Sequence, residues 1–202
     1  ATAGLGVTMV IITAGIDLSV GSLIALSVVV TAWVLNLPAE AAGGWFEAHP
    51  AWLPAAAVAA GTAAATLAGL ANGAVIVGLR LVPFIVTLGS MGMIRGLAKG
   101  IADEKDIYPP GDTWVGAMMD PALTSADRSW MIFPPGVWIL IACVLASWFL
   151  LRYTQLGRHI YAVGSNRETA RLCGVRVGRT QLVVYSLTGF FCGLAGLMQF
   201  SY

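Results

Sequence analysis

Long stretches without a single charged residue dominate this chain. They cover residues 1–16, 18–39, 50–79, 81–94, 129–151 and 180–202. The hydrocarbon core of a bilayer is about 30 Å thick, so a helix that crosses it needs about 20 apolar residues. Lipid offers the backbone no hydrogen-bond partners, and the ten-residue alternation typical of membrane barrels is missing from the sequence. The predicted fold is therefore an all-α, polytopic transmembrane bundle.

The charges are distributed unevenly. Residues 152–180 hold six arginines and one acid, Glu168, whereas most acids lie in 102–135. Because positively charged loops stay in the cytoplasm, 152–180 is predicted to be a cytoplasmic segment. The predicted span 136–151 crosses the membrane once between the two segments, so 102–135 is predicted to be an external loop. Arg95 and Lys99, near the outer end of the predicted span 82–101, go against this rule.

A broken or re-entrant helix is predicted near residues 15–22, whose sequence is GIDLSVGS. A continuous helix over residues 1–37 would be about 55 Å long at 1.5 Å per residue, too long for one straight crossing. Irregular backbone at membrane depth has to be buried in protein or line a wet cavity. Asp17 lies in this break and has two alternative roles. It could bind a substrate hydroxyl, or it could cap the helix that begins near Ser19.

Other polar or aromatic residues within the apolar stretches also have two readings each. Asn72 is a buried amide that either joins helices or contacts a ligand. Pro83 should interrupt the helix before 82–101. Phe84 and Thr87, just past it, either line a pathway or pack in the core. Asp17, Ser19, Asn72, Phe84 and Thr87 form the predicted substrate-pathway set. His49 and His159 have no partners at ligand spacing, so no metal site is predicted.

Small residues recur at four-residue spacing, which is typical of closely packed membrane helices. They are Gly69 and Gly73, then Gly92, Gly96 and Gly100, and then Gly189 and Gly193. We expect these faces to serve helix packing.

The cytoplasmic segment carries the signals of a short helix. Ser165 and Glu168 have the spacing of a capping box, and Gly174 suits the left-handed residue that ends a helix. A helix of about two turns is marginal in isolation, so it should pack on a partner or on the spans themselves. The alternative is a surface turn whose arginines serve only topology.

Three blocks of the sequence resemble the ribose-type permeases of bacterial ABC importers. They are 15–22 (GIDLSVGS), 82–89 (VPFIVTLG) and 155–197, which opens with QLGRHIYAVGSN. They occur in the family's order, and the resemblance covers nearly the whole chain. It implies a single permease domain over 1–202, here an internal fragment that is cut at both ends. It also implies a multi-pass protein of the bacterial cytoplasmic (inner) membrane.

The resemblance also implies partners. These are cytoplasmic ATPase subunits, a second permease copy or a paralogue, and a periplasmic sugar-binding protein. Glu168, Ala170 and Gly174 match the importers' coupling motif, with Thr169 in place of an alanine. Ser165, Asn166, Glu168, Ala170 and Gly174 are thus the expected coupling residues, and they would contact the ATPase.

The expected function is a permease that moves a monosaccharide by ATP-driven alternating access. No Walker-type phosphate loop is present in the sequence, so ATP and Mg²⁺ would bind the partner ATPase, and this chain would carry no cofactor and no catalysis. Nucleic acid is not an expected partner. Two alternatives are an ion-coupled secondary transporter that uses Asp17 and a permease for branched-chain amino acids. The sequence leaves open which sugar is carried and whether the permease pairs with an identical copy.

Overall fold

The computed structural model describes residues 1–37, 52–105, 115 and 133–200. These residues form helices joined by turns, with no strand in the described ranges. The helices are α1 (Thr2–Ile12), α2 (Val20–Leu35), α5 (Trp52–Gly78), α6 (Pro83–Ile101), α8 (Pro135–Tyr153), α9 (Gln155–Ser165), α10 (Arg167–Leu172) and α11 (Val177–Phe200). Four of them, α5, α6, α8 and α11, are long and apolar enough to cross a membrane. The predicted all-α, multi-pass bundle is confirmed.

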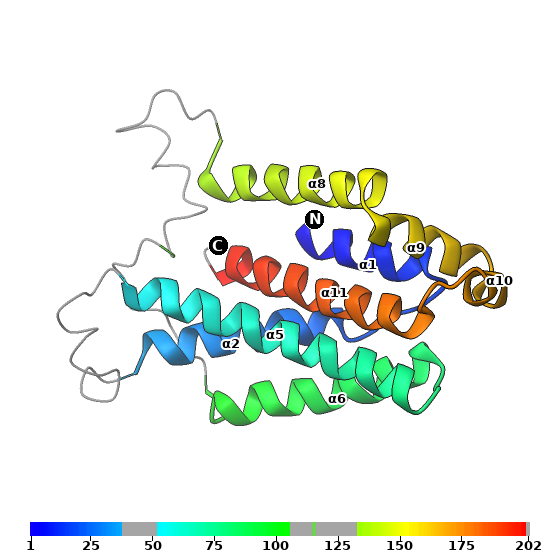
Figure 1. The fold of residues 1–202 in the computed structure, drawn as a ribbon. Coiled ribbons are helices and arrows are strands. Elements are labelled where there is room, and N and C mark those ends of the chain that lie inside the picture. Colours follow the sequence, from blue (N-terminus) through cyan, green and yellow to red (C-terminus); the bar gives the residue numbers. More distant parts are fainter. Residues whose placement is uncertain (38–51, 106–114, 116–132, 201–202) are drawn as a thin grey trace.

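Helix α11 lies at the centre of the bundle and packs against α5, α1 and α2 (Figure 1). Glycines let α5 and α11 approach backbone to backbone. A Cβ added to Gly69 would lie 2.5 Å from the Tyr185 carbonyl oxygen, and one added to Gly189 would meet the Ala65 carbonyl. The expected packing role of small residues is confirmed at this contact. On α6 it is not met, because Cβ atoms on Gly92, Gly96 and Gly100 would have no described atom within 4 Å.

The basic segment 152–180 lies at one end of the bundle (Figure 1). The α5–α6 turn, with Arg80, lies at the same end as α9 and α10 (Figure 1). The start of α5 and the ends of α2 and α6 lie at the other end. The residues 38–51, which include His49, lie outside the described residues. So does most of the predicted external loop 102–135.

The segment 152–180 folds into two helices where the sequence predicted one. The extra helix, α9, begins after Thr154, whose side-chain oxygen accepts a hydrogen bond from the Gly157 amide at 3.2 Å. It buries Ile160 and Val163 on one side and exposes Arg158 on the other. Two glycines within α9, Gly157 and Gly164, weaken the helical signal in the sequence. The structure gives both of them a packing role.

Candidate functional site

The chain leaves helical geometry between α1 and α2, as the sequence predicted. Helix α1 ends at Ile12, and Ala14 adopts a left-handed backbone with φ of 56°. The Gly15 amide then donates to the Val10 carbonyl at 3.0 Å, which reverses the chain. Helices α1 and α2 consequently run in opposite directions (Figure 1). Residues 13–19 are named the break below.

Asp17 is buried within the break, where its side chain closes the turn before α2. One carboxylate oxygen accepts from the Ser19 amide at 2.8 Å and from the Ser19 hydroxyl at 2.6 Å. These bonds close a turn on Ser19, the residue before α2, and no described side chain accepts a hydrogen bond from the first amides of α2. The second carboxylate oxygen, Oδ2, is buried without a hydrogen-bond partner among the described residues. Asp17 therefore keeps a free acceptor in addition to its structural role.

Two helices, α5 and α6, bring polar side chains to the break. Asn72 of α5 donates its amide to the Ser19 hydroxyl oxygen at 3.0 Å. Thr87 of α6 is fully buried, and its hydroxyl is 3.3 Å from the Ile16 carbonyl oxygen, which accepts from it. Asp17, Ser19, Asn72 and Thr87 are together named the break cluster. Phe84 stands apart, because its side chain is 44% exposed.

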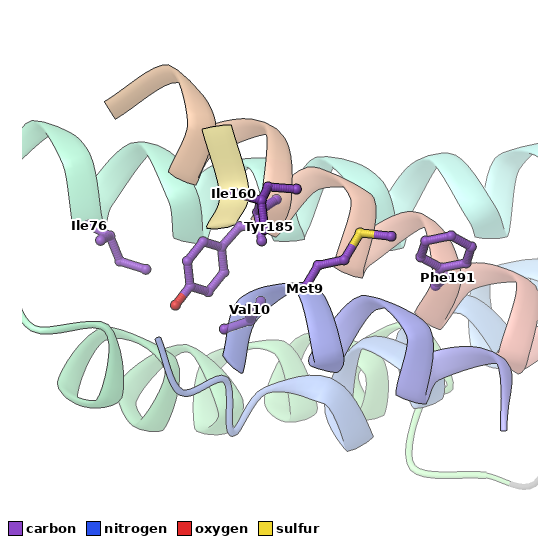
Figure 2. Packing of buried hydrophobic residues seen from close by; sticks show 7 residues of the cluster. Met9, Val10, Ile76, Ile160, Tyr185 and Phe191 are labelled. Carbon is purple, nitrogen blue, oxygen red and sulfur yellow. The ribbon is translucent and has the colours of Figure 1, made fainter. Parts of the chain in front are cut away.

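Tyr185 is a member of this site that sequence reasoning missed. It is 1% exposed on α11, and Figure 2 shows its ring among the buried side chains of α1, α5 and α9, including Val10 and Ile160. A Cβ on Gly15 would lie 2.9 Å from the Tyr185 hydroxyl oxygen, so that oxygen reaches the break. Like Asp17 Oδ2, it has no hydrogen-bond partner in the described part of the chain. An aromatic residue in an apolar run gives no sequence signal beyond core packing.

The predicted capping box at Ser165 is wrong by one residue. Helix α9 continues through Ser165, so the extended residue that can cap α10 is Asn166, with φ of −158° and ψ of 112°. Its side-chain oxygen accepts from the Thr169 amide at 3.0 Å. Glu168 points to Arg171 instead of back to Ser165, in an exposed ion pair of 3.8 Å.

Gly174 ends the α10 segment as predicted, with φ of 84°. The helix has an inner and an outer face. Ala170 is buried against the protein, whereas Leu172 is 84% exposed. An apolar side chain this exposed, beside the Glu168–Arg171 pair, gives α10 a mixed apolar and charged outer surface.

The α9–α10 segment touches the break directly. The Arg167 guanidinium donates to the Thr13 carbonyl at 3.4 Å. Gly164 packs so closely on the Ile12 carbonyl that any Cβ there would clash with it. The end of α1 is thus held by the same segment that presents α10 to the outside.

Comparison with known proteins decides the family. The family model described as "Branched-chain amino acid transport system / permease component" matches residues 1–202. The chain belongs to this family. The membership predicted from the three sequence blocks is confirmed, and the four membrane-length helices agree with a multi-pass permease fold.

Several curated relatives of this permease chain are sugar importers by name. It is 33% identical over 204 residues to the ribose import permease protein RbsC of Escherichia coli strain K12, covering 96% of this chain and 55% of the relative. It is 34% identical to the fructose import permease protein FrcC of Rhizobium meliloti, covering 96% and 50%. It is also 34% identical to the L-arabinose transport system permease protein AraH of E. coli K12, covering 90% and 49%. The chain spans about half the length of these relatives. No solved structure matches it.

Proposed function

We propose that this chain is part of the transmembrane permease subunit of an ABC importer that moves a monosaccharide into the cytoplasm. The observation that carries the proposal is the contact between α10 and the break through Arg167 and the Thr13 carbonyl. It joins an exposed, capped helix suited to docking a partner with a buried polar cluster. The relatives named as ribose, fructose and L-arabinose permeases support a sugar as the cargo.

In this proposal α10 is the element through which the ATPase acts. Asn166 and Gly174 fix the two ends of α10, and Ala170 holds its inner face against the protein. Glu168 and the exposed Leu172 face the ATPase, while Ser165 ends α9 beside them. ATP and Mg²⁺ bind the ATPase, and this chain performs no catalysis. ATP-driven closure of the ATPase displaces α10 as a rigid body, which is a common form of switching.

The break cluster is the part of this chain that we assign to the sugar pathway. A buried carboxylate oxygen and a buried hydroxyl without partners are costly to leave unsatisfied, by about 1–3 kcal/mol each. Asp17 Oδ2 and the Tyr185 hydroxyl are such a pair. A sugar hydroxyl can donate to the first and exchange hydrogen bonds with the second. When α10 moves the end of α1, these two groups become available to a passing sugar.

The remaining partners follow from the same proposal. A periplasmic binding protein delivers the sugar, a second permease copy or a paralogue completes the pathway, and the assembly resides in the bacterial cytoplasmic membrane. The two alternatives, ion-coupled transport through Asp17 and a branched-chain amino acid cargo, make different predictions for uptake.

The test is uptake by the full-length permease reconstituted in proteoliposomes with the ATPase and binding protein encoded beside it. Labelled ribose, fructose, arabinose and leucine are offered with and without ATP inside the vesicles. We expect accumulation of a sugar that requires both ATP and the binding protein. Uptake driven by a proton or sodium gradient without ATP would replace the proposal with a secondary transporter. Uptake of leucine without uptake of any of the sugars would replace the proposed monosaccharide cargo with a branched-chain amino acid.

A further inference from the structure

A hollow of about 490 Å³ lies where α8 meets α9 and is not used by the proposed transport function. Trp148, Leu151, Arg152, Arg158 and Tyr161 line it. The first three come from the last turns of a membrane-length helix, and the other two come from the amphipathic helix that follows. The hollow therefore lies where the membrane is expected to meet the cytoplasm.

The elbow between α8 and α9 fixes the shape of this hollow. The Thr154 hydroxyl donates to the Leu150 carbonyl at 2.6 Å and accepts from the Gly157 amide at 3.2 Å. Gly157 sits against the last carbonyls of α8, and a Cβ on it would be 2.5 Å from the Leu150 carbonyl oxygen. The end of one helix and the start of the next are thus locked together. Arg152 and Arg158 are held on either side of this elbow.

The two arginines carry uncompensated charge. The ion pairs found among the described residues are Lys105 with Asp103 and Arg171 with Glu168. The sequence contains no acid between Asp127 and Glu168, so neither Arg152 nor Arg158 has an acidic neighbour along the chain. Two guanidinium groups around one hollow suit a phosphate, which arginine binds through paired N–H groups.

The other wall of the hollow is apolar and continues along the membrane-length helix. Trp148 is 55% exposed and packs edge-on against Tyr153, with 5.3 Å between ring centroids. The exposed side chains that lead away from it along α8 are Trp138, Ile141, Val144 and Leu145. Tryptophan and tyrosine gather at the level of lipid headgroups, and aliphatic side chains below them face acyl chains. A soluble anion would need no such apolar extension.

We propose that the hollow between Arg152 and Arg158 binds the phosphate headgroup of an anionic membrane phospholipid, whose acyl chains lie along the exposed face of α8. Basic pockets on the cytoplasmic side of membrane helices are suited to such headgroups. The site is distinct from the outer face of α10, so it does not depend on ATPase docking or on the identity of the cargo.

The experiment is native mass spectrometry of the full-length permease after incubation with equal amounts of phosphatidylglycerol and phosphatidylcholine. The variant is Arg152→Gln with Arg158→Gln. The matched control is Arg171→Gln with Arg179→Gln, which removes two exposed charges at the same end of the bundle. We expect the wild type and the control to retain phosphatidylglycerol preferentially. In the variant that preference should fall by about fivefold for each arginine, or about 25-fold in total.

Three results would overturn the assignment. The first is an unchanged lipid preference in the Arg152/Arg158 variant, or an equal fall in the control. The second is displacement of the lipid by millimolar inorganic phosphate, which would indicate a site for a soluble anion. The third is displacement by the purified ATPase, which would make the hollow part of a protein interface.

Discussion

Substitutions at Gly174 separate backbone geometry from packing at the end of α10. Its φ of 84° is in the left-handed region, and a Cβ there would meet no described atom within 4 Å. The cost of a side chain is therefore conformational. It amounts to about 1 kcal/mol for alanine and about 2 kcal/mol for the β-branched valine, and it is smaller for asparagine, which tolerates this region.

These costs convert into populations. Because about 1.4 kcal/mol is a factor of ten, the wild-type geometry after α10 should become about fivefold rarer with alanine and about thirtyfold rarer with valine. The amides that report on it are those of Gly174 and Val175, which donate to the carbonyls of Arg171 and Ala170 at 3.0 Å. Hydrogen exchange at the Val175 amide should be accelerated least by Gly174→Asn, more by Gly174→Ala and most by Gly174→Val.

The functional assay is ATP-dependent uptake by the full-length permease, with ATPase pull-down measured in parallel. We expect uptake to fall least in Gly174→Asn and most in Gly174→Val, while the amount of membrane-inserted protein stays constant. Gly174→Asn is the matched control, because it adds a side chain without forbidding the backbone. Wild-type exchange and uptake in Gly174→Val would refute the reasoning for this turn and for the coupling role of α10.

Three further predictions concern the break and the bundle. Asp17→Leu should lower the free energy of unfolding by about 1–3 kcal/mol, because it leaves a buried amide and hydroxyl without their acceptor. Asp17→Asn should lower it by less. Thermal melting and an uptake assay check both predictions. Arg167→Gln should reduce uptake about fivefold, from about 1 kcal/mol of lost hydrogen bonding, yet leave ATPase binding intact. Arg179→Gln, which removes an exposed charge from α11, should leave uptake unchanged, and equal uptake by both variants contradicts the prediction. Gly189→Val should destabilise the bundle by about 1–3 kcal/mol in detergent melting, whereas Gly92→Val should be neutral.

Local signals in the sequence were sufficient for much of this structure. The apolar stretches predicted the membrane-length helices, and the glycines, serines and Asp17 near 15–22 predicted the break. Pro83 begins α6 after the interruption expected of it, and Gly174 is left-handed as its position after a short helix indicated. Each of these features depends on the residue itself and its chain neighbours.

The features that were missed depend on contacts between distant segments. Helix α9 was not predicted because its glycines lower helix propensity, and their reason for being there, close contact with α8 and α1, is tertiary. Tyr185 reaches the break from a helix about 170 residues along the chain from Gly15 (185 minus 15). Phe84 and Thr87 both follow Pro83 and have the same two interpretations in the sequence. Only the packing of α6 shows that Thr87 is buried and Phe84 is exposed.

The break has a consequence for how easily the permease can change shape. Two of its carbonyls accept hydrogen bonds from side chains of other elements, because Thr87 donates to Ile16 and Arg167 donates to Thr13. Releasing one such bond costs about 0.5–1.5 kcal/mol and unwinds no helix. A rearrangement of the loop that releases one of these bonds therefore costs little compared with unfolding a helix. The two donors belong to α6 and α10. Movement of either helix can therefore release the break while α1 and α2 stay folded.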